Sequence, residues 1–295
     1  MISINPRIDF ITSLITPFKN NLEIDYNVLS DLITFQSDNE VDSLVLCGIM
    51  GEGGSLTLNE IIRIVENTRR NINSNLKIIV NIGRSSLRET LNLIEVIENL
   101  VDAFLIIPPF YYKLVDLRGL YNYFSKALDS VNRPVILGNV PEYTGIHINK
   151  DLIEKLLKYE SFLGIMNSGG NLTNTQHLIE TFPIKVFVRN DALLFQSFKI
   201  GAHGVISGLS NIINPVEVRQ IIKDMEANDF DSAQRKKQQL TKILSIINEF
   251  PSIAVLKSIL HWKELTSLKL RVRPPLIDLN NKQDIELFNK LGELI

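Results

Sequence analysis

Short apolar runs recur along this chain, and each is followed by a turn and then by an amphipathic stretch with helical spacing. Most of the runs are rich in Val, Ile, Leu or Phe, which is typical of strands buried on both faces of a parallel sheet. The runs lie at residues 11–15, 43–47, 77–82, 103–107, 134–137, 162–166, 185–188 and 204–206.

The stretches between the runs carry signals for helix starts. Thr57 with Glu60 predicts a capping box, and Ser86 with Glu89 repeats the pattern one unit later. Apolar residues follow at helical spacing in both cases, so each stretch has one face suited to packing on a sheet. The chain therefore alternates strand and helix, which predicts an α/β fold with parallel strands.

The alternation alone leaves two architectures open, a closed (β/α)₈ barrel and a doubly wound open sheet. The strand signals end near residue 211, and only helical patterns follow. We expect residues 1–211 to form the strand-bearing part and residues 212–295 to form a C-terminal helical extension packed on it, as a single structural unit. The expected helices of the extension cover residues 215–227, 229–249, 252–265 and 282–294.

Composition narrows the function classes. The 295 residues carry a net charge of -2, with 45% hydrophobic and 22% charged residues, which argues against a nucleic-acid partner. Cys47 is the one cysteine, so no intramolecular disulfide is expected. Arg7 and Asp9 interrupt the start of the chain, so no signal peptide is expected. No apolar run is long enough for a membrane span, and we expect a cytoplasmic protein.

Several turn sequences resemble one known family. Gly-Ile-Met-Gly-Glu resembles Gly-Thr-Thr-Gly-Glu, and Gly-Ile-Met-Asn resembles Gly-Ile-Lys-Glu, of the dihydrodipicolinate synthase/N-acetylneuraminate lyase family. Six such segments occur in family order and cover most of the chain. The resemblance implies a (β/α)₈ TIM barrel with a C-terminal helical extension. The segments are residues 48–52, 108–112, 138–145, 164–171, 201–207 and 273–276.

The resemblance also implies a chemistry and a place for it. In the family, a lysine on the sixth strand forms a Schiff base with pyruvate, and a tyrosine after the fifth strand moves protons with a threonine and a second tyrosine. The amine must be deprotonated to attack, and a partly desolvated barrel mouth favours that form. Sites on this fold lie at the carboxyl ends of the strands.

This chain departs from the family at the positions that match those residues. Met166 matches the lysine and cannot form an imine, and Gly138 matches the tyrosine and has no side chain. Ile49 and Met50 match the threonines and have no hydroxyl group. The substrate-binding arginine matches Tyr143 or its neighbour Glu142, and the glutamate after the lysine matches Asn167. We therefore expect pyruvate Schiff-base chemistry to be absent.

Another lysine could substitute only if it lay at the barrel mouth. Lys19 and Lys113 follow the first and fourth strands in surface loops, and Lys113 ranks first among the candidate substitutes. Lys199 falls on a barrel helix, and Lys257 resembles a scaffold position in the extension. The sequence thus offers no strong replacement nucleophile.

Arg189 is the main candidate for binding a ligand. It follows the seventh strand, where the family has a small residue, and it could hold a carboxylate or phosphate bidentately. The alternative is that it pairs with Glu52 or Asp191 and fills space. Tyr111 and Tyr112 could line the mouth, pack, or contact another subunit. The further ligand-binding candidates are Asn190, Asn167, Ser168, Tyr143, Glu52 and Ile206.

Other chemistry has little support. The histidines at positions 147, 177, 203 and 261 are scattered and lack ligand spacing, so we expect no metal and no cofactor. Three functions remain: a pseudoenzyme or small-acid-binding protein, an enzyme that uses Arg189 without a Schiff base, and a true lyase or synthase. By resemblance, we expect a homodimer or homotetramer.

Overall fold

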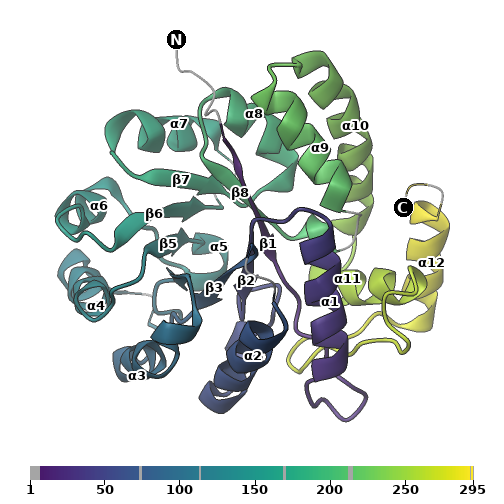
Figure 1. Ribbon diagram of the computed structural model, residues 1–295, viewed down its shortest axis with the longest axis horizontal. Coiled ribbons are helices and arrows are strands. Elements are labelled where there is room, and N and C mark those ends of the chain that lie inside the picture. Colours follow the sequence, from purple (N-terminus) through teal and green to yellow (C-terminus); the bar gives the residue numbers. More distant parts are fainter. Residues whose placement is uncertain are drawn as a thin grey trace.

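The computed structural model describes residues 7–72, 75–112, 114–168, 171–211, 215–292 and 294. Eight parallel strands close into a barrel in sequence order, and β1 pairs with β8 (Figure 1). The expected (β/α)₈ barrel is therefore confirmed, and the open sheet is excluded. The strands are β1 (Asp9–Ser13), β2 (Ser43–Leu46), β3 (Lys77–Asn81), β4 (Ala103–Ile106), β5 (Val135–Asn139), β6 (Phe162–Asn167), β7 (Lys185–Val188) and β8 (Gly204–Ser207).

All eight apolar runs are strands, although their ends differ by up to two residues from the expected ones. The largest difference is at β1, which begins at Asp9 because Asp9 pairs with Gly204 of β8. β5 extends to Asn139, which pairs with Asn167 of β6. Backbone pairing with neighbouring strands, which hydropathy does not report, sets these ends.

Helices surround the barrel in the positions that the amphipathic stretches predict. The Thr57 capping box is confirmed, whereas Ser86 accepts a hydrogen bond from the Glu89 amide without the reciprocal bond being seen among the described residues. The helices between strands are α1 (Tyr26–Asp38), α2 (Leu58–Asn71), α3 (Leu87–Ile97), α4 (Leu117–Asp129), α5 (Pro141–Thr144), α6 (Lys150–Leu156), α7 (Leu172–Thr181) and α8 (Leu194–Lys199).

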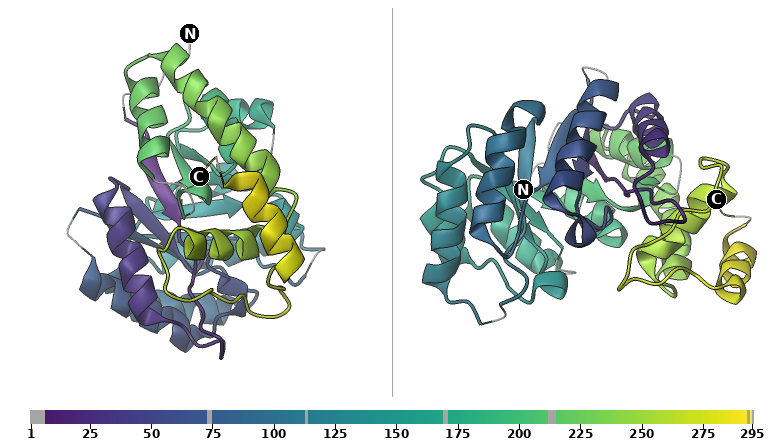
Figure 2. Two further views of the ribbon diagram at one scale, coloured as in Figure 1. Left: turned by 90° about the vertical axis from the view of Figure 1, so that its right-hand side faces the viewer. Right: turned by 90° about the horizontal axis from the view of Figure 1, so that it is seen from below.

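Four helices follow β8 and lie along one side of the barrel (Figure 2). The first of them, α9 (Pro215–Glu226), contacts α8 and so continues the ring of barrel helices. The others are α10 (Phe230–Ile247), α11 (Ser252–Trp262) and α12 (Asn281–Leu291). None of the described helices is by itself long and apolar enough to cross a bilayer. α10 and α11 reach that length and composition only together, as a pair bent by 114°.

Two apolar layers hold the barrel together. The larger one lies between the strands and the surrounding helices. The smaller one fills the inside of the barrel and includes Ile11, Val45, Ile136, Met166 and Phe187. Inward side chains of a barrel normally pack into such layers, so the axis is solid and a binding site must lie at one end.

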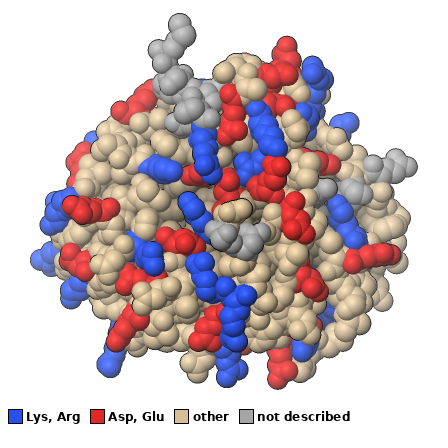
Figure 3. All heavy atoms as spheres, in the orientation of Figure 1, with Lys and Arg blue, Asp and Glu red and all other residues tan. Residues whose placement is uncertain are grey.

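Charged side chains are mixed over the visible face of the molecule. Lys and Arg alternate with Asp and Glu in Figure 3, and this face has no broad basic stripe. Arg219 and Lys223 illustrate the mixing, since they pair with Asp42 and Glu40. This face therefore lacks the electrostatic footprint of nucleic-acid binding.

Candidate functional site

Apolar side chains fill the barrel axis at the carboxyl ends of the strands. Met166 points inward from β6 and is 2% exposed. Together with other apolar residues and with the polar residues Ser13, Asn81 and Arg189, it surrounds a space of only about 10 Å³, and the apolar neighbours include Ile49, Ile107 and Ile206. One water molecule needs about 10–15 Å³ measured in this way. The centre of the mouth is therefore plugged for anything larger than water.

We call the side chains that close the barrel axis, namely Ile49, Ile107, Met166 and Ile206, the plug. Gly138 on β5 lies against it. A Cβ atom at this position would lie 2.9 Å from Ile107 Cγ2 and 3.3 Å from Met166 Cε. The first distance is shorter than carbon atoms tolerate without movement. Residue 138 therefore has no room for a side chain while Ile107 and Met166 keep their places.

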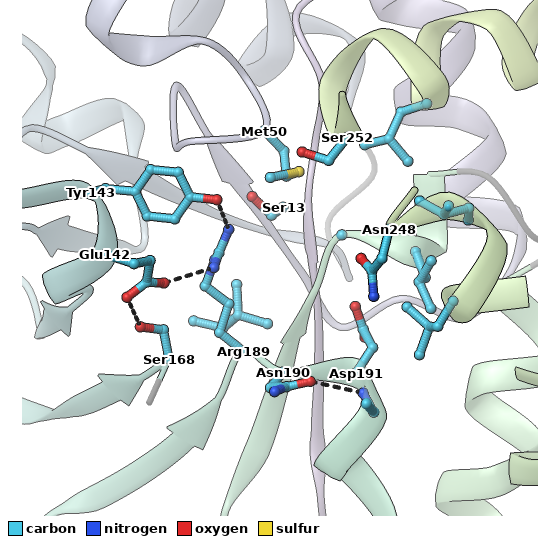
Figure 4. A pocket seen from close by; sticks show the side chains of 17 residues that line it. Ser13, Met50, Glu142, Tyr143, Ser168, Arg189, Asn190, Asp191, Asn248 and Ser252 are labelled. Atoms are coloured by element: carbon cyan, nitrogen blue, oxygen red, sulfur yellow. Dashed lines mark hydrogen bonds and ion pairs between the residues drawn. The ribbon is translucent and has the colours of Figure 1, made fainter. Parts of the chain in front are cut away.

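Open space lies beside the plug, between the strand ends and helices α10 and α11. This cavity has a volume of about 500 Å³. Leu244, Ile247 and Leu256 are among its apolar lining residues. Polar side chains such as Arg189 and Asn248 line it from opposite sides (Figure 4). The polar and charged lining residues are Ser13, Glu142, Tyr143, Ser168, Arg189, Asn190, Asp191, Asn248 and Ser252.

Arg189 stands on the cavity wall and is held by α5. Its guanidinium donates to Glu142 Oε1 at 3.2 Å and to the Tyr143 hydroxyl at 3.2 Å, and it lies 4.9 Å from the centre of the Tyr143 ring. Ser168 donates to the other oxygen of Glu142 at 2.7 Å. The sequence offered Glu52 or Asp191 as the alternative partner of Arg189, and this expectation is wrong. Arg189 forms its salt bridge with Glu142.

Asp191 lies across the cavity from Glu142, at the start of a short 3₁₀ turn after β7 (Figure 4). Its side chain is nine-tenths buried, and burial raises the pKa of its carboxyl to about 6. Hydrogen bonds from Ser207 and from the amides of Gly208 and Leu209, with the charge of Arg189, act in the opposite direction. A carboxylate with a pKa close to neutrality in a cavity is a typical functional group.

The cavity contains five of the proposed ligand-binding residues. Arg189, Asn190, Ser168, Tyr143 and Ile206 all line it, although the Asn190 side chain is occupied by capping the Ala192 amide. The remaining two proposed residues do not line the cavity.

Asn167 and Glu52 have structural partners instead. The amide of Asn167 accepts from Asn139 at 3.0 Å and donates to Thr175 at 3.2 Å. Glu52 is buried in an ion pair with Lys257 and accepts from the Arg273 amide at 2.8 Å. These interactions were not evident from sequence because the partners lie on other elements, from Thr175, eight residues after Asn167 on α7, to Lys257, 205 residues after Glu52 on α11.

The remaining candidate positions are the two that match the family threonines, Ile49 and Met50, and the tyrosines Tyr111 and Tyr112. Ile49 belongs to the plug, and Met50 lines the cavity. Tyr111 and Tyr112 form an edge-to-face pair with ring centres 5.3 Å apart, and they are 77% and 64% exposed. Neither tyrosine lines the cavity. Their role as packing or subunit contact stays a prediction.

None of the described lysines reaches the plug or the cavity. Lys19 lies in an exposed turn, and Lys199 lies over the rings of Phe195 and Phe230. Lys257 is 1% exposed and bound to Glu52 and the Arg271 carbonyl. Lys113 lies outside the described residues.

Two further observations concern reactive groups. Cys47 is buried, and burial raises the pKa of its thiol to about 12, so the thiol is unreactive at neutral pH. Among the residues that the structure describes, no cluster of His, Cys, Asp and Glu has the arrangement of a metal site. His203, for example, accepts from the Val186 amide at 3.1 Å.

Five polar or charged cavity residues were missed as ligand-binding candidates from sequence, and one of them, Ser13, is the last residue of β1. Glu142 and Asp191 follow strands, and this position was a usable signal on a barrel fold. Asn248 and Ser252 lie at the junction of α10 and α11, some 60 residues after Arg189. Only the packing of that junction over the barrel mouth brings them to the cavity, so no local signal could have identified them.

Comparison with known proteins places these features in context. The sequence profile described as the dihydrodipicolinate synthetase family matches residues 8–293. The 4-hydroxy-tetrahydrodipicolinate synthase of Methanococcus maripaludis is 28% identical over 284 residues, which cover 96% of each chain. That of Hydrogenobaculum sp. is 30% identical over 240 residues, which cover 80% of this chain and 82% of the relative.

Solved structures give the same result. A dihydrodipicolinate synthase from Bacillus anthracis aligns over 99% of each chain with a TM-score of 0.90 at 25% identity. The enzyme from Aquifex aeolicus aligns over 97% of this chain and 98% of its own, with a TM-score of 0.91 at 26% identity. The barrel and the C-terminal helices are thus shared over nearly the whole chain.

Proposed function

This chain belongs to the dihydrodipicolinate synthetase family, and from that premise we propose that it keeps the family scaffold without pyruvate Schiff-base aldolase chemistry. In its place, the cavity around Arg189 binds a small ligand that carries a carboxylate or phosphate group. The protein would then be a pseudoenzyme or a small-acid-binding protein.

The plug at the barrel axis is the observation that carries the proposal. The position that resembles the family lysine holds the buried Met166, and Gly138 stands where the family has its tyrosine. The remaining space of about 10 Å³ holds at most one water, so a keto acid does not fit beside Met166. Imine formation also needs an uncharged amine. None of the described lysines reaches this space.

Arg189 supports the binding part of the proposal. A guanidinium has five N–H groups, and hydrogen bonds from Arg189 to Glu142 and Tyr143 involve its two terminal nitrogens. A ligand carboxylate can share the same cation, because planar guanidinium groups bind acids bidentately. The apolar lining residues Leu244, Ile247 and Leu256 would cover the rest of the ligand.

Borohydride trapping tests the chemical part. The protein is incubated with pyruvate and sodium borohydride, and its intact mass is measured, with the Methanococcus maripaludis synthase as the positive control. We expect the control to gain a reduced adduct and this chain to remain unmodified. A stoichiometric adduct on this chain would contradict the proposal, and peptide mapping would identify the lysine, Lys113 included.

A thermal-shift screen tests the binding part. Keto acids, sugar acids and phosphorylated compounds are screened against the wild-type protein and the Arg189→Ala variant. We expect the compounds that raise the melting temperature of the wild type to lose their effect on the variant. Unchanged shifts on the variant would exclude Arg189 as the binding group.

A second candidate function is a lyase- or synthase-like enzyme that acts on a keto acid or sugar acid without an imine. The carboxyl of Asp191 favours it, because a pKa of about 6 suits a general acid or base near neutral pH. Turnover of a screened ligand by the wild type and its loss in Arg189→Ala would support this candidate. Binding without turnover supports the first function.

The last part of the proposal concerns the cellular compartment and the oligomeric state of the protein. We place it in the cytoplasm as a homodimer or homotetramer, on the resemblance to its family and on the exposure of Tyr111 and Tyr112. Light scattering with size-exclusion chromatography tests the assembly. A monomer at micromolar concentration would exclude both oligomers.

A further inference from the structure

A second groove lies on the outside of the barrel, between α4 and α6, and shares no lining residue with the cavity at the barrel mouth. Its volume is about 610 Å³. The two helices contact each other in the outer ring, on the side of the barrel away from α10 and α12 (Figure 1). Ligand pockets commonly have volumes of about 300–1,000 Å³, so the groove has room for a small molecule. The lining residues are Leu117, Arg118, Tyr121, Lys155 and Lys158.

The apolar part of the lining comes from α4. Leu117 and Tyr121 are partly buried and pack against the hydrophobic core. They stand four residues apart on the helix, so they share one of its faces. The Tyr121 hydroxyl hydrogen-bonds with that of Tyr159 at 3.3 Å, which restricts the ring. An apolar group in the groove would therefore be removed from water against α4.

All the other lining residues are cations. Arg118, Lys155 and Lys158 are exposed, and none of them forms a salt bridge within the described part of the chain. Each lysine has an acidic residue four positions earlier, which is the spacing of ion pairs in helices. Those acids, Asp151 and Glu154, form no salt bridge there either. The lining thus carries three positive charges and no negative one.

Lys158 is positioned by two aromatic rings. Its ammonium lies 5.7 Å from the centre of the Tyr121 ring and 5.2 Å from that of Tyr159. Hydrogen bonding to Tyr121 also raises the pKa of Lys158, so the amine stays protonated at neutral pH. An ammonium group has three donors, and one is left for a ligand when both tyrosine hydroxyls are counted.

We propose that this groove binds a small phosphorylated compound with an apolar body. The phosphate group lies among Arg118, Lys155 and Lys158, and the apolar body packs on α4. A phosphate ester carries close to two negative charges at neutral pH and three strong acceptor oxygens. Arginine binds such a group bidentately, and lysine binds it as a point charge. The proposal goes beyond the function proposed above, because the groove and the mouth cavity are separate sites.

Simpler ligands satisfy only part of the lining. A carboxylate brings one negative charge to three cations. Inorganic phosphate leaves Leu117 and Tyr121 in contact with water, and an uncharged apolar compound leaves the cations without an anion. A ligand that combines the two features meets both halves of the groove, and charge-assisted hydrogen bonds are about twice as strong as neutral ones.

Isothermal titration calorimetry with phenyl phosphate tests the proposal. Phenol, benzoate and inorganic phosphate are the comparison ligands, and the Arg189→Ala variant is used at pH 7.5 so that the cation of the mouth cavity is absent. We expect phenyl phosphate to bind with a Kd on the order of 1 mM or lower, and at least about fivefold more tightly than each comparison ligand. Equal affinities would overturn the proposal, as would no saturation by about 10 mM.

Charge variants connect the binding to the groove. Arg118→Gln and Lys155→Gln should each weaken the binding of phenyl phosphate by at least about threefold, because each removes one of three cations. Lys126→Gln is the matched control, since Lys126 is exposed on the same helix and does not line the groove. Unchanged affinity in the two groove variants would overturn the proposal, as would an equal loss in the control.

Lysine labelling gives a reading on the wild-type protein. The exposed amines are acetylated with acetic anhydride, and the rate at each lysine is read by peptide mass spectrometry. Saturating phenyl phosphate should slow the labelling of Lys155 and Lys158 by at least about twofold and leave Lys126 unchanged. No protection, or equal protection of all three lysines, would overturn the proposal.

An acidic peptide is the competing occupant of a groove of this charge. A capped tripeptide of glutamate, leucine and glutamate is therefore titrated beside phenyl phosphate. We expect the peptide to bind more weakly, because its two carboxylates are far apart and ordering its flexible chain has an entropic cost. Tighter binding of the peptide would make the groove a protein-docking site and overturn the proposal.

Discussion

Gly138 on β5 and Met166 on β6 are paired residues of adjacent strands, and the Met166 methyl lies 3.3 Å from the point that a Cβ of residue 138 would occupy. The absence of a side chain at one position is therefore coupled to the size of the side chain at the other. The two positions that resemble the family lysine and tyrosine thus form one packing unit in this chain.

Adding a methyl group to this unit should destabilise the protein. We expect Gly138→Ala to lower the free energy of unfolding by about 1–3 kcal/mol, because the new Cβ would overlap Ile107 Cγ2. Urea unfolding measures the change. In an Ile107→Ala background the same substitution should cost less, since that change removes the overlapping atom. Equal costs in both backgrounds would show that Ile107 is not the obstacle.

Restoring a lysine at position 166 should not restore an aldolase. Met166→Lys puts an ammonium group into an apolar space, which lowers its pKa and destabilises the fold by several kcal/mol. Between its folded and unfolded pKa values the unfolded state binds more protons, so the stability of the variant relative to wild type should rise with pH. Urea unfolding at pH 7 and pH 9 checks this.

Enzyme assays of the same variant give an independent reading. We expect no lyase or synthase turnover, because Gly138 and Ile49 still lack the hydroxyl groups of a proton relay. Turnover by Met166→Lys alone would contradict the view that several elements of the family mechanism are missing together.

The sequence predicted the barrel because its information is local and repeated. Apolar runs, turns and capping residues each depend on near neighbours, and together they fixed eight strands and their helices. The substitutions at Met166 and Gly138 were also visible in the sequence, since each lies next to scaffold residues that resemble the family, and the absence of Schiff-base chemistry stays a prediction. Strand ends such as Asp9 were less accurate because pairing with another strand determines them.

The site was predicted only in part because its contacts join distant segments. Arg189 was found, but its partner Glu142 lies 47 residues earlier on α5. Glu52 was proposed as a ligand-binding residue, yet Lys257 of α11 neutralises it within the core. The spacing of apolar residues along the chain does not indicate which acidic side chain a given Arg or Lys contacts. The ion pairs could therefore be identified only from the structure.

The buried pair of Lys257 and Glu52 should anchor the C-terminal helices to the barrel. Lys257→Met leaves the Glu52 carboxylate buried without its cation, so we expect a loss of about 3–5 kcal/mol in unfolding free energy. Adding Glu52→Gln should recover part of that loss. Chemical unfolding of Lys257→Met, Glu52→Gln and the double variant completes the cycle. If the double variant loses the sum of the two single losses, the residues are not coupled.

Asp191 should make the ligand-free protein less stable at neutral pH. Its folded pKa of about 6 lies above the ordinary value of 3.8, so the folded state binds more protons between these values and stability falls as the pH rises through them. We expect Asp191→Asn to stabilise the protein by about 1–3 kcal/mol at pH 7.5. The gain should be smaller at pH 5.

Urea unfolding at the two pH values measures the difference between variant and wild type. Asp231→Asn is the control, since its exposed carboxylate should contribute little at either pH. A gain that is equal at pH 5 and pH 7.5 would show that the charge of Asp191 is not its source.

Glu142 should compete with an acidic ligand for Arg189, because its carboxylate already occupies the guanidinium at 3.2 Å. Removing that charge frees the cation, so we expect Glu142→Gln to bind the acids found by the thermal-shift screen several-fold more tightly than wild type. Arg189→Gln should abolish binding, since it removes the cation itself. Calorimetry at low and high salt measures both, and the gain in Glu142→Gln should shrink in high salt. Weaker binding by Glu142→Gln would mean that Glu142 positions Arg189 for the ligand instead of competing with it.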